Sequence, residues 1–191
     1  MTRGRLEAFS DGVLAIIITI MVLELRPPEG RALAELRPLL PVFLSYVLSF
    51  IYVGIYWNNH HHLMHTVRSV NGWILWANSH LLFWLSLVPF ATAWLGSSGG
   101  GEWPAVVYGF VLLMAAVAYT VLVRALLALH GRDSELAQAI GGDFKGKISL
   151  VVYVAAIGLA FVDERLAYAL YVLVAAMWFI PDRRIESKVR Q

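Results

Sequence analysis

The chain has 191 residues and a formal net charge of +2, and 59% of its residues are apolar while only 15% are charged. Soluble domains carry about 25% charged residues, so this composition and a mean hydropathy of +0.68 indicate an integral membrane protein. The length predicts a single domain, residues 1–191. The absence of cysteine excludes disulfides, thiolate metal sites and a cysteine nucleophile. The basic residues sit in short loops and the tail, where membrane topology explains them, so the pI near 9.0 does not indicate nucleic-acid binding.

Six apolar segments predict an all-α membrane protein with six spanning helices. The predicted spans are residues 5–25, 38–65, 70–95, 103–129, 147–162 and 166–180. The first reaches the ~20 residues that a span needs. It lacks a small-residue cleavage site, so we expect a retained helix rather than a signal peptide. The last two spans are short and form a tight hairpin, and the polar stretch 131–146 predicts a short cytoplasmic linker helix.

The distribution of basic residues predicts the orientation in the membrane. With a cytoplasmic N-terminus, eleven of the 15 Lys and Arg residues fall in inside segments. Cytoplasmic loops of membrane proteins carry such an excess. We therefore expect a multi-pass protein of the cell membrane with both termini in the cytoplasm.

One face of the first helix carries a row of large apolar side chains. Ile16, Ile20 and Leu23 follow the spacing i, i+4, i+7, which places them together. Because any membrane helix is apolar on all sides, the spacing of this row does not by itself indicate a function. In the functional interpretation, such rows from several subunits form a hydrophobic constriction that gates a pore by dewetting.

Polar residues at the base of this helix need partners. Arg5 and Asp11 are six residues apart and point about 120° away from each other, so they do not pair directly. Buried polar groups in a membrane must find partners, and His60 in the second helix and Asn78 in the third are available. The alternative is that Arg5 and Asp11 lie in the headgroup layer with Glu7.

The histidines of the second helix suggest a metal site at first sight. His61 and His65 are spaced i, i+4, which suits a shared ion. His80 and His130 are isolated, so a second ligand cluster is missing and metal catalysis is disfavoured. Neither a phosphate loop nor a dinucleotide fingerprint occurs. We therefore expect no metal site, no cofactor and no enzymatic activity.

Three blocks of residues together resemble the prokaryotic branch of the lysosomal potassium channel family, transmembrane protein 175. The first is Arg5-x-x-x-Phe9-Ser10-Asp11-Gly12 with Ala15-Ile16-x-x-Thr19 and Leu23-Glu24; the second is Trp57-x-x-His60-His61-x-Leu63; the third is Trp76-x-Asn78 with Leu87-Val-Pro89-Phe-x-Thr92. The resemblance covers roughly residues 3 to 96.

The resemblance implies a homotetramer in the lipid bilayer, with helix 1 lining a central pore that has no re-entrant filter loop. Monovalent cations, K+ above all, would permeate it. Ile16 would form the narrowest ring, Ile20 and Leu23 further layers, and Thr19 a hydroxyl layer that favours potassium. The run of Ile at positions 16 to 18 would make this neck more apolar than usual.

The same resemblance implies that Arg5, Ser10 and Asp11 hold the base of helix 1 against helices 2 and 3 through His60 and Asn78. Two other functions remain open. One is a proton-conducting channel or proton-coupled transporter that uses Asp11 and the helix 2 histidines. The other is a His-dependent membrane enzyme.

Overall fold

The computed structural model describes residues 2–131, 134–141 and 143–179. Its elements in chain order are α1 (Arg3–Leu23), the 3-10 helix η1 (Leu33–Leu39), α2 (Leu40–His65), α3 (Gly72–Ser86), α4 (Val88–Ser97), α5 (Glu102–His130), α6 (Glu135–Ile140), α7 (Phe144–Ala160) and α8 (Glu164–Phe179). The predicted all-α fold is confirmed, and α6 is the short linker helix that the polar stretch after α5 predicts.

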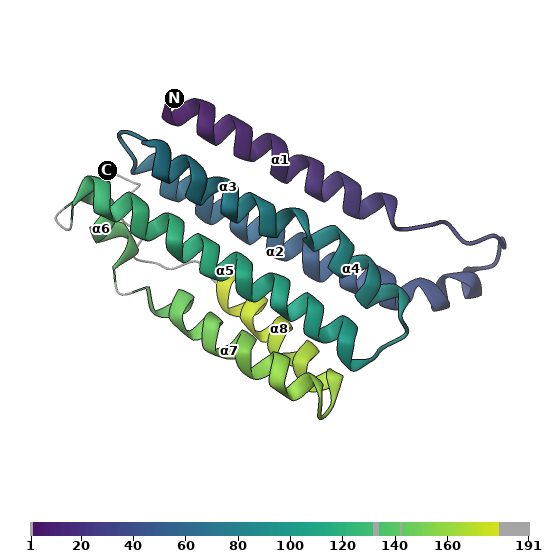
Figure 1. The fold of residues 1–191 in the computed structure, drawn as a ribbon. Coiled ribbons are helices and arrows are strands. Elements are labelled where there is room, and N and C mark those ends of the chain that lie inside the picture. Colours follow the sequence, from purple (N-terminus) through teal and green to yellow (C-terminus); the bar gives the residue numbers. More distant parts are fainter. Residues whose placement is uncertain (1, 132–133, 142, 180–191) are drawn as a thin grey trace.

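The long helices lie side by side along one direction (Figure 1). Helix α1 forms one edge and packs on α2, α3 and α4, while α7 and α8 form the opposite edge. Between them lies α5, which contacts α3 and α4 on one side and α7 and α8 on the other. Helix α1 therefore has neighbours on one face only.

Four helical segments of the described chain are long and apolar enough to cross a membrane. They are Arg3–Leu23, Leu33–His65, Gly72–Ser97 and Glu102–His130. Helices α7 and α8 have 17 and 16 residues. At a rise of 1.5 Å per residue each is about 25 Å long, less than the ~30 Å hydrocarbon core. That these two helices also cross the membrane stays a prediction.

The helix predicted over residues 70–95 is two helices, α3 and α4, which meet at Leu87. Pro89 stands at the start of α4 and has no N–H to donate to the carbonyl of Leu85. The ring of a proline also clashes with the carbonyl four residues before it, so the helix is interrupted there. The helix predicted from residue 38 likewise begins as η1, which contains Pro38.

Buried hydroxyl groups connect the helices of the core. Ser49 of α2 is 2.9 Å from the Tyr108 hydroxyl of α5 and accepts a hydrogen bond from Thr92 of α4 at 2.7 Å. The Tyr52 hydroxyl donates to the backbone carbonyl of Tyr171 in α8 at 2.6 Å. These bonds satisfy polar groups that would be costly to leave unpaired in an apolar interior.

Candidate functional site

Helix α1 has two faces of different character. Its buried face consists of residues that pack into the subunit: Leu6, Ser10, Leu14, Ile17 and Met21. The residues predicted to line a pore are on the exposed face, where Ile16 is 58%, Ile20 44% and Leu23 77% exposed. Thr19 is exposed beside them. Large apolar side chains thus form a continuous row that no other part of the described chain covers.

The three consecutive isoleucines of α1 lie on different faces of the helix, and that they make a pore neck more apolar stays a prediction. Only Ile16 points outward, because Ile17 is 3% exposed and Ile18 packs partly against the core. Successive residues of a helix are rotated by about 100°, so a run of three cannot share one face. Ile17 and Ile18 therefore do not belong to the exposed row of Ile16, Ile20 and Leu23.

The Thr19 hydroxyl has an acceptor partner within its own helix. It donates to the backbone carbonyl of Ile16 within α1, at 2.9 Å. A hydroxyl has one donor and two acceptor lone pairs. With its proton used inside the helix, the Thr19 oxygen presents acceptor capacity on the exposed face.

A buried chain of hydrogen bonds connects the opposite face of α1 to α3 and α2. Asn78 of α3 donates from Nδ2 to the Ser10 hydroxyl at 2.9 Å, and Ser10 donates to the backbone carbonyl of Leu6 at 2.9 Å. Asn78 Oδ1 lies 2.8 Å from His60 Nε2 of α2. Ser10, His60 and Asn78 are each at most 1% exposed. The predicted residues Ser10, His60 and Asn78 are therefore brought together.

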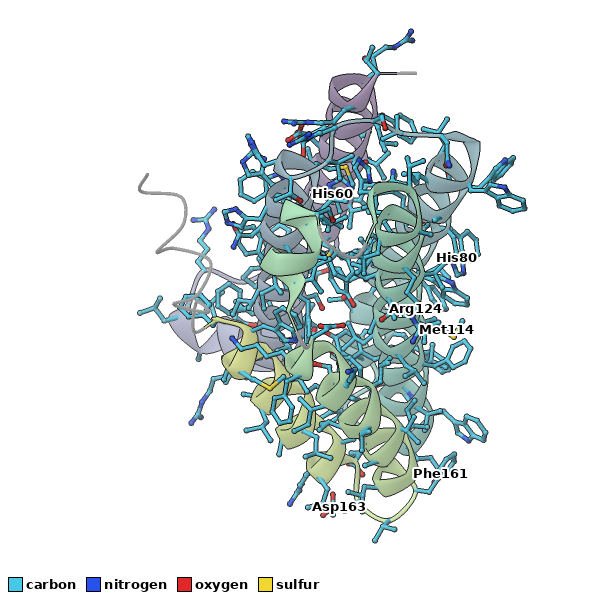
Figure 2. All side chains as sticks on the ribbon, turned by 90° about the vertical axis from the view of Figure 1, so that its left-hand side faces the viewer. His60, His80, Met114, Arg124, Phe161 and Asp163 are labelled. Atoms are coloured by element: carbon cyan, nitrogen blue, oxygen red, sulfur yellow. The ribbon has the colours of Figure 1, made fainter. Side chains whose placement is uncertain are left out.

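The direction of this chain defines the tautomer of His60. Asn78 Oδ1 can only accept, so His60 Nε2 carries the proton. Nδ1 of the same ring is buried and has no hydrogen-bond partner among the described residues. Figure 2 places His60 toward the opposite end of the molecule from Asp163, which precedes α8.

Asp11 and Arg5 do not join that chain within the described subunit. Asp11 is half-buried and accepts a hydrogen bond from Trp57 Nε1 of α2 at 3.1 Å. Arg5 is exposed, and its side chain forms no hydrogen bond or ion pair with any described residue. The arginine that ties α1 to the end of α2 is Arg3, which donates from Nη1 to the carbonyls of His65 and Val67 at 3.3 Å each.

Glu7 is the site residue that sequence reasoning placed only in the headgroup layer. Its Oε1 lies 3.1 Å from Nδ1 of His61, and its Oε2 lies 4.0 Å from Nε of Arg3. The i, i+4 spacing of Arg3 and Glu7 was a visible signal for the second contact. The first joins residues 54 positions apart, and no local pattern predicts such a pairing.

A second polar group lies outside the predicted site. Asp143 caps the N-terminus of α7, where it accepts from the Gly146 N–H at 3.2 Å. It lines a cavity with Tyr56, Tyr119 and Trp178. Burial raises the pKa of the Asp143 carboxyl above its usual range, while the Gly146 N–H and the charges of Lys147 and Arg124 act in the opposite direction.

The motifs of the first half of the chain match a known family. The profile of the endosomal/lysosomal potassium channel TMEM175 matches residues 5–89. A potassium channel of Chryseobacterium sp. is 57% identical over 191 residues, which cover all of both chains. This chain belongs to the TMEM175 family. The family consists of ion channels, so the expectation that the protein is not an enzyme is confirmed.

Other members of the TMEM175 family extend the match to the second half of the chain. A potassium channel of Streptomyces collinus is 31% identical over 183 residues, which cover 90% of this chain and 89% of that one. The crystal structure of a lysosomal potassium-selective TMEM175 homolog from Chamaesiphon minutus superposes with a TM-score of 0.79 at 28% identity, over 93% of this chain and 96% of that one. This similarity and the apolar helices identify a multi-pass membrane protein.

The mammalian members of the TMEM175 family match over a shorter range. The human endosomal/lysosomal proton channel TMEM175 is 38% identical over 80 residues, which cover 36% of this chain and 16% of that one.

Proposed function

We propose that this TMEM175-family protein is a potassium-permeable cation channel of the cell membrane, with a pore lined by α1 of four identical subunits. The observation that carries the proposal is the exposed apolar row of Ile16, Ile20 and Leu23, opposite the buried hydrogen-bond chain. Four copies of α1 around one axis would cover this row without help from another protein.

The apolar row supports a gate without charged groups. Rings of branched aliphatic side chains can close a pore by dewetting. Ile16 would form the narrowest ring, with Ile20 and Leu23 as wider layers above it. Because these side chains are 44% to 77% exposed in the described subunit, their further packing would depend on the neighbouring copies.

Thr19 supports a modest preference among alkali ions. Its hydroxyl proton is used by the carbonyl of Ile16, so the oxygen would face a passing cation with its lone pairs. A ring of four such oxygens could replace part of the hydration shell of K+. Monovalent cations are the ions that this mainly uncharged neck would pass.

The absence of native cysteine makes the assembly and topology directly testable. In a Leu23→Cys variant, oxidation should cross-link subunits into disulfide-bonded pairs, and the mass of the protein in native detergent solution should correspond to four chains and no more. Ser98→Cys should react with a membrane-impermeant thiol reagent applied outside the cell, and Ser134→Cys only after permeabilisation. The opposite labelling pattern would contradict cytoplasmic termini.

Channel activity itself is tested by the reversal potential of purified protein in planar bilayers, with K+ on one side and Na+ on the other. We expect current without any partner substrate and a reversal potential shifted toward the potassium equilibrium potential. A folded preparation that carries no current would contradict a potassium-permeable channel, and a reversal potential that stays at zero would contradict a preference for K+ over Na+.

Proton conduction is a second candidate, since several mammalian relatives are named proton channels. Asp11 and His60 would be its titratable groups. Against a relay, Asp11 bonds to Trp57 rather than to the Ser10–Asn78–His60 chain, and that chain passes through an amide that does not titrate. Proton flux into liposomes that disappears in both Asp11→Asn and His60→Ala would favour this candidate.

A further inference from the structure

Three potential metal ligands meet where the N-terminal part of α1 crosses the C-terminal turn of α2. They are Glu7, His61 and His65, and one ligand atom of each lies within 4.8 Å of the other two. The Glu7 Oε1 and His61 Nδ1 atoms are already 3.1 Å apart. His61 directly follows His60 in α2, and Figure 2 labels His60.

The helix geometry places both imidazoles on the same side of α2. His61 and His65 are spaced i, i+4, and their ring centroids are 4.4 Å apart with a T-shaped arrangement. The Trp57 ring stacks on His61 at 5.9 Å and 21°. The His61 imidazole is therefore held in place by its neighbours, whereas the His65 imidazole can adjust by a side-chain rotation.

The burial and partners of the three groups differ in a way that suits an ion. The Glu7 side chain is 18% exposed and His61 38%, whereas His65 is open to solvent. Neither ring nitrogen of His65 has a hydrogen-bond partner among the described residues. The Arg3 guanidinium lies 4.0 Å from the second carboxylate oxygen and orients Glu7 without using Oε1.

Two imidazole nitrogens and one carboxylate oxygen form a donor set that zinc-class divalent ions accept. Such ions bind three protein ligands and keep a fourth position for water. The exposed side of His65 leaves room for that water. Hard ions such as Mg2+ and Ca2+ prefer an all-oxygen set and are disfavoured here.

We propose that Glu7, His61 and His65 bind one divalent transition-metal ion of the zinc class per chain, which cross-links α1 to α2. A metal site was not expected from the sequence because His80 and His130 are isolated and give no second cluster, whereas Glu7 supplies a third ligand from another helix. None of the three ligands belongs to the exposed row of Ile16, Ile20 and Leu23, and the existence of the metal site does not depend on which ion permeates.

The test is zinc titration of the full-length purified protein after removal of any affinity tag, followed by calorimetry and by the thermal unfolding midpoint. We expect one ion per chain and a higher midpoint with zinc. His65→Gln and Glu7→Gln should each weaken binding by at least about tenfold, since even outer-shell changes at metal sites cost that much. Cobalt should give the visible absorption of a four-coordinate ion.

His62→Gln is the matched control, because His62 is exposed beside the cluster and is not a member of it. It should bind zinc like the unmodified protein, and His65→Cys should retain binding through a thiolate. Equal loss of affinity in His62→Gln and His65→Gln would overturn the site, as would no zinc binding by the unmodified protein. An unchanged midpoint of the variants without metal checks that their folds are intact.

Discussion

His60 Nε2 and Asn78 Oδ1 lie 2.8 Å apart in the buried interior, and Asn78 continues the connection to Ser10 of α1. One amide side chain thereby joins three helices. Because Ser10 must face Asn78, the rotation of α1 about its own axis is defined. The row of Ile16, Ile20 and Leu23 then faces away from the subunit.

We predict that Asn78→Ala destabilises the protein by about 1–3 kcal/mol, because it leaves polar groups of Ser10 and His60 buried without a partner. The thermal unfolding midpoint in detergent should fall, whereas Asn58→Ala, at an exposed position of α2, should leave it unchanged. The effects of Asn78→Ala and His60→Ala should not add. Additive effects would mean that the two side chains are not coupled.

Thr19→Val should reduce the preference for K+ over Na+, because it removes the exposed oxygen and keeps the shape of the side chain. Thr19→Ser should preserve the preference. The measurement is the permeability ratio from reversal potentials of the three proteins. If Thr19→Val keeps the unmodified ratio, the hydroxyl layer has no part in selectivity.

Gly109→Ala should lower the unfolding midpoint. An added Cβ would collide with the hydroxyl of Tyr171, which donates to the Ala105 carbonyl at 2.9 Å between α8 and α5. Gly158→Ala is the control, since a Cβ there meets no atom within 4 Å. That variant should be neutral or gain up to about 1 kcal/mol of helix propensity. Equal midpoints for both variants would contradict the close packing of α5 on α8.

Asp143→Asn should remove a pH dependence of stability. Burial raises the pKa of Asp143 in the folded state, so its protonated form favours folding. The contribution of protonated Asp143 to the free energy of unfolding is complete below its unfolded-state pKa and is lost as the pH rises through its folded-state pKa. At neutral pH the Asn variant should be at least as stable as the unmodified protein.

Two substitutions of Asp143, the N-cap of α7, distinguish the effect of its charge from the effect of its hydrogen bond. Asn can accept from the Gly146 N–H as Asp143 does, and it tolerates the left-handed backbone with φ of 43°. Asp143→Ala should instead cost about 1 kcal/mol through the lost cap. Unfolding midpoints at mildly acidic and neutral pH distinguish the three proteins, and an Asn variant that loses as much as the Ala variant would contradict this assignment.

Local periodicity predicted the helices and predicted that Ile16, Ile20 and Leu23 share one face of α1, whereas the direction of that face was implied only by the family resemblance. The i, i+4, i+7 spacing of Ile16, Ile20 and Leu23 is a property of one helix, whatever surrounds it. The break at Leu87 also had a local signal in Pro89, which apolar composition outweighed in the prediction of one long helix.

Contacts between helices could be predicted only where few partners were available. Asn78 was a candidate because buried polar groups are rare in these helices, and it does meet His60. The choice between Arg3 and Arg5 depended on the packing angle of α1 on α2, which no spacing reveals. The same holds for Glu7, whose carboxylate meets His61 across 54 positions.

Single-channel conductance of Ile16→Asn tests most directly whether Ile16 forms the narrowest part of a pore. A polar ring should wet the constriction, and a barrier lowered by about 1.4 kcal/mol would raise conductance about tenfold. Val151→Asn, at an exposed position of α7, should conduct like the unmodified protein. Unchanged conductance in a folded Ile16→Asn channel would contradict a constriction at Ile16.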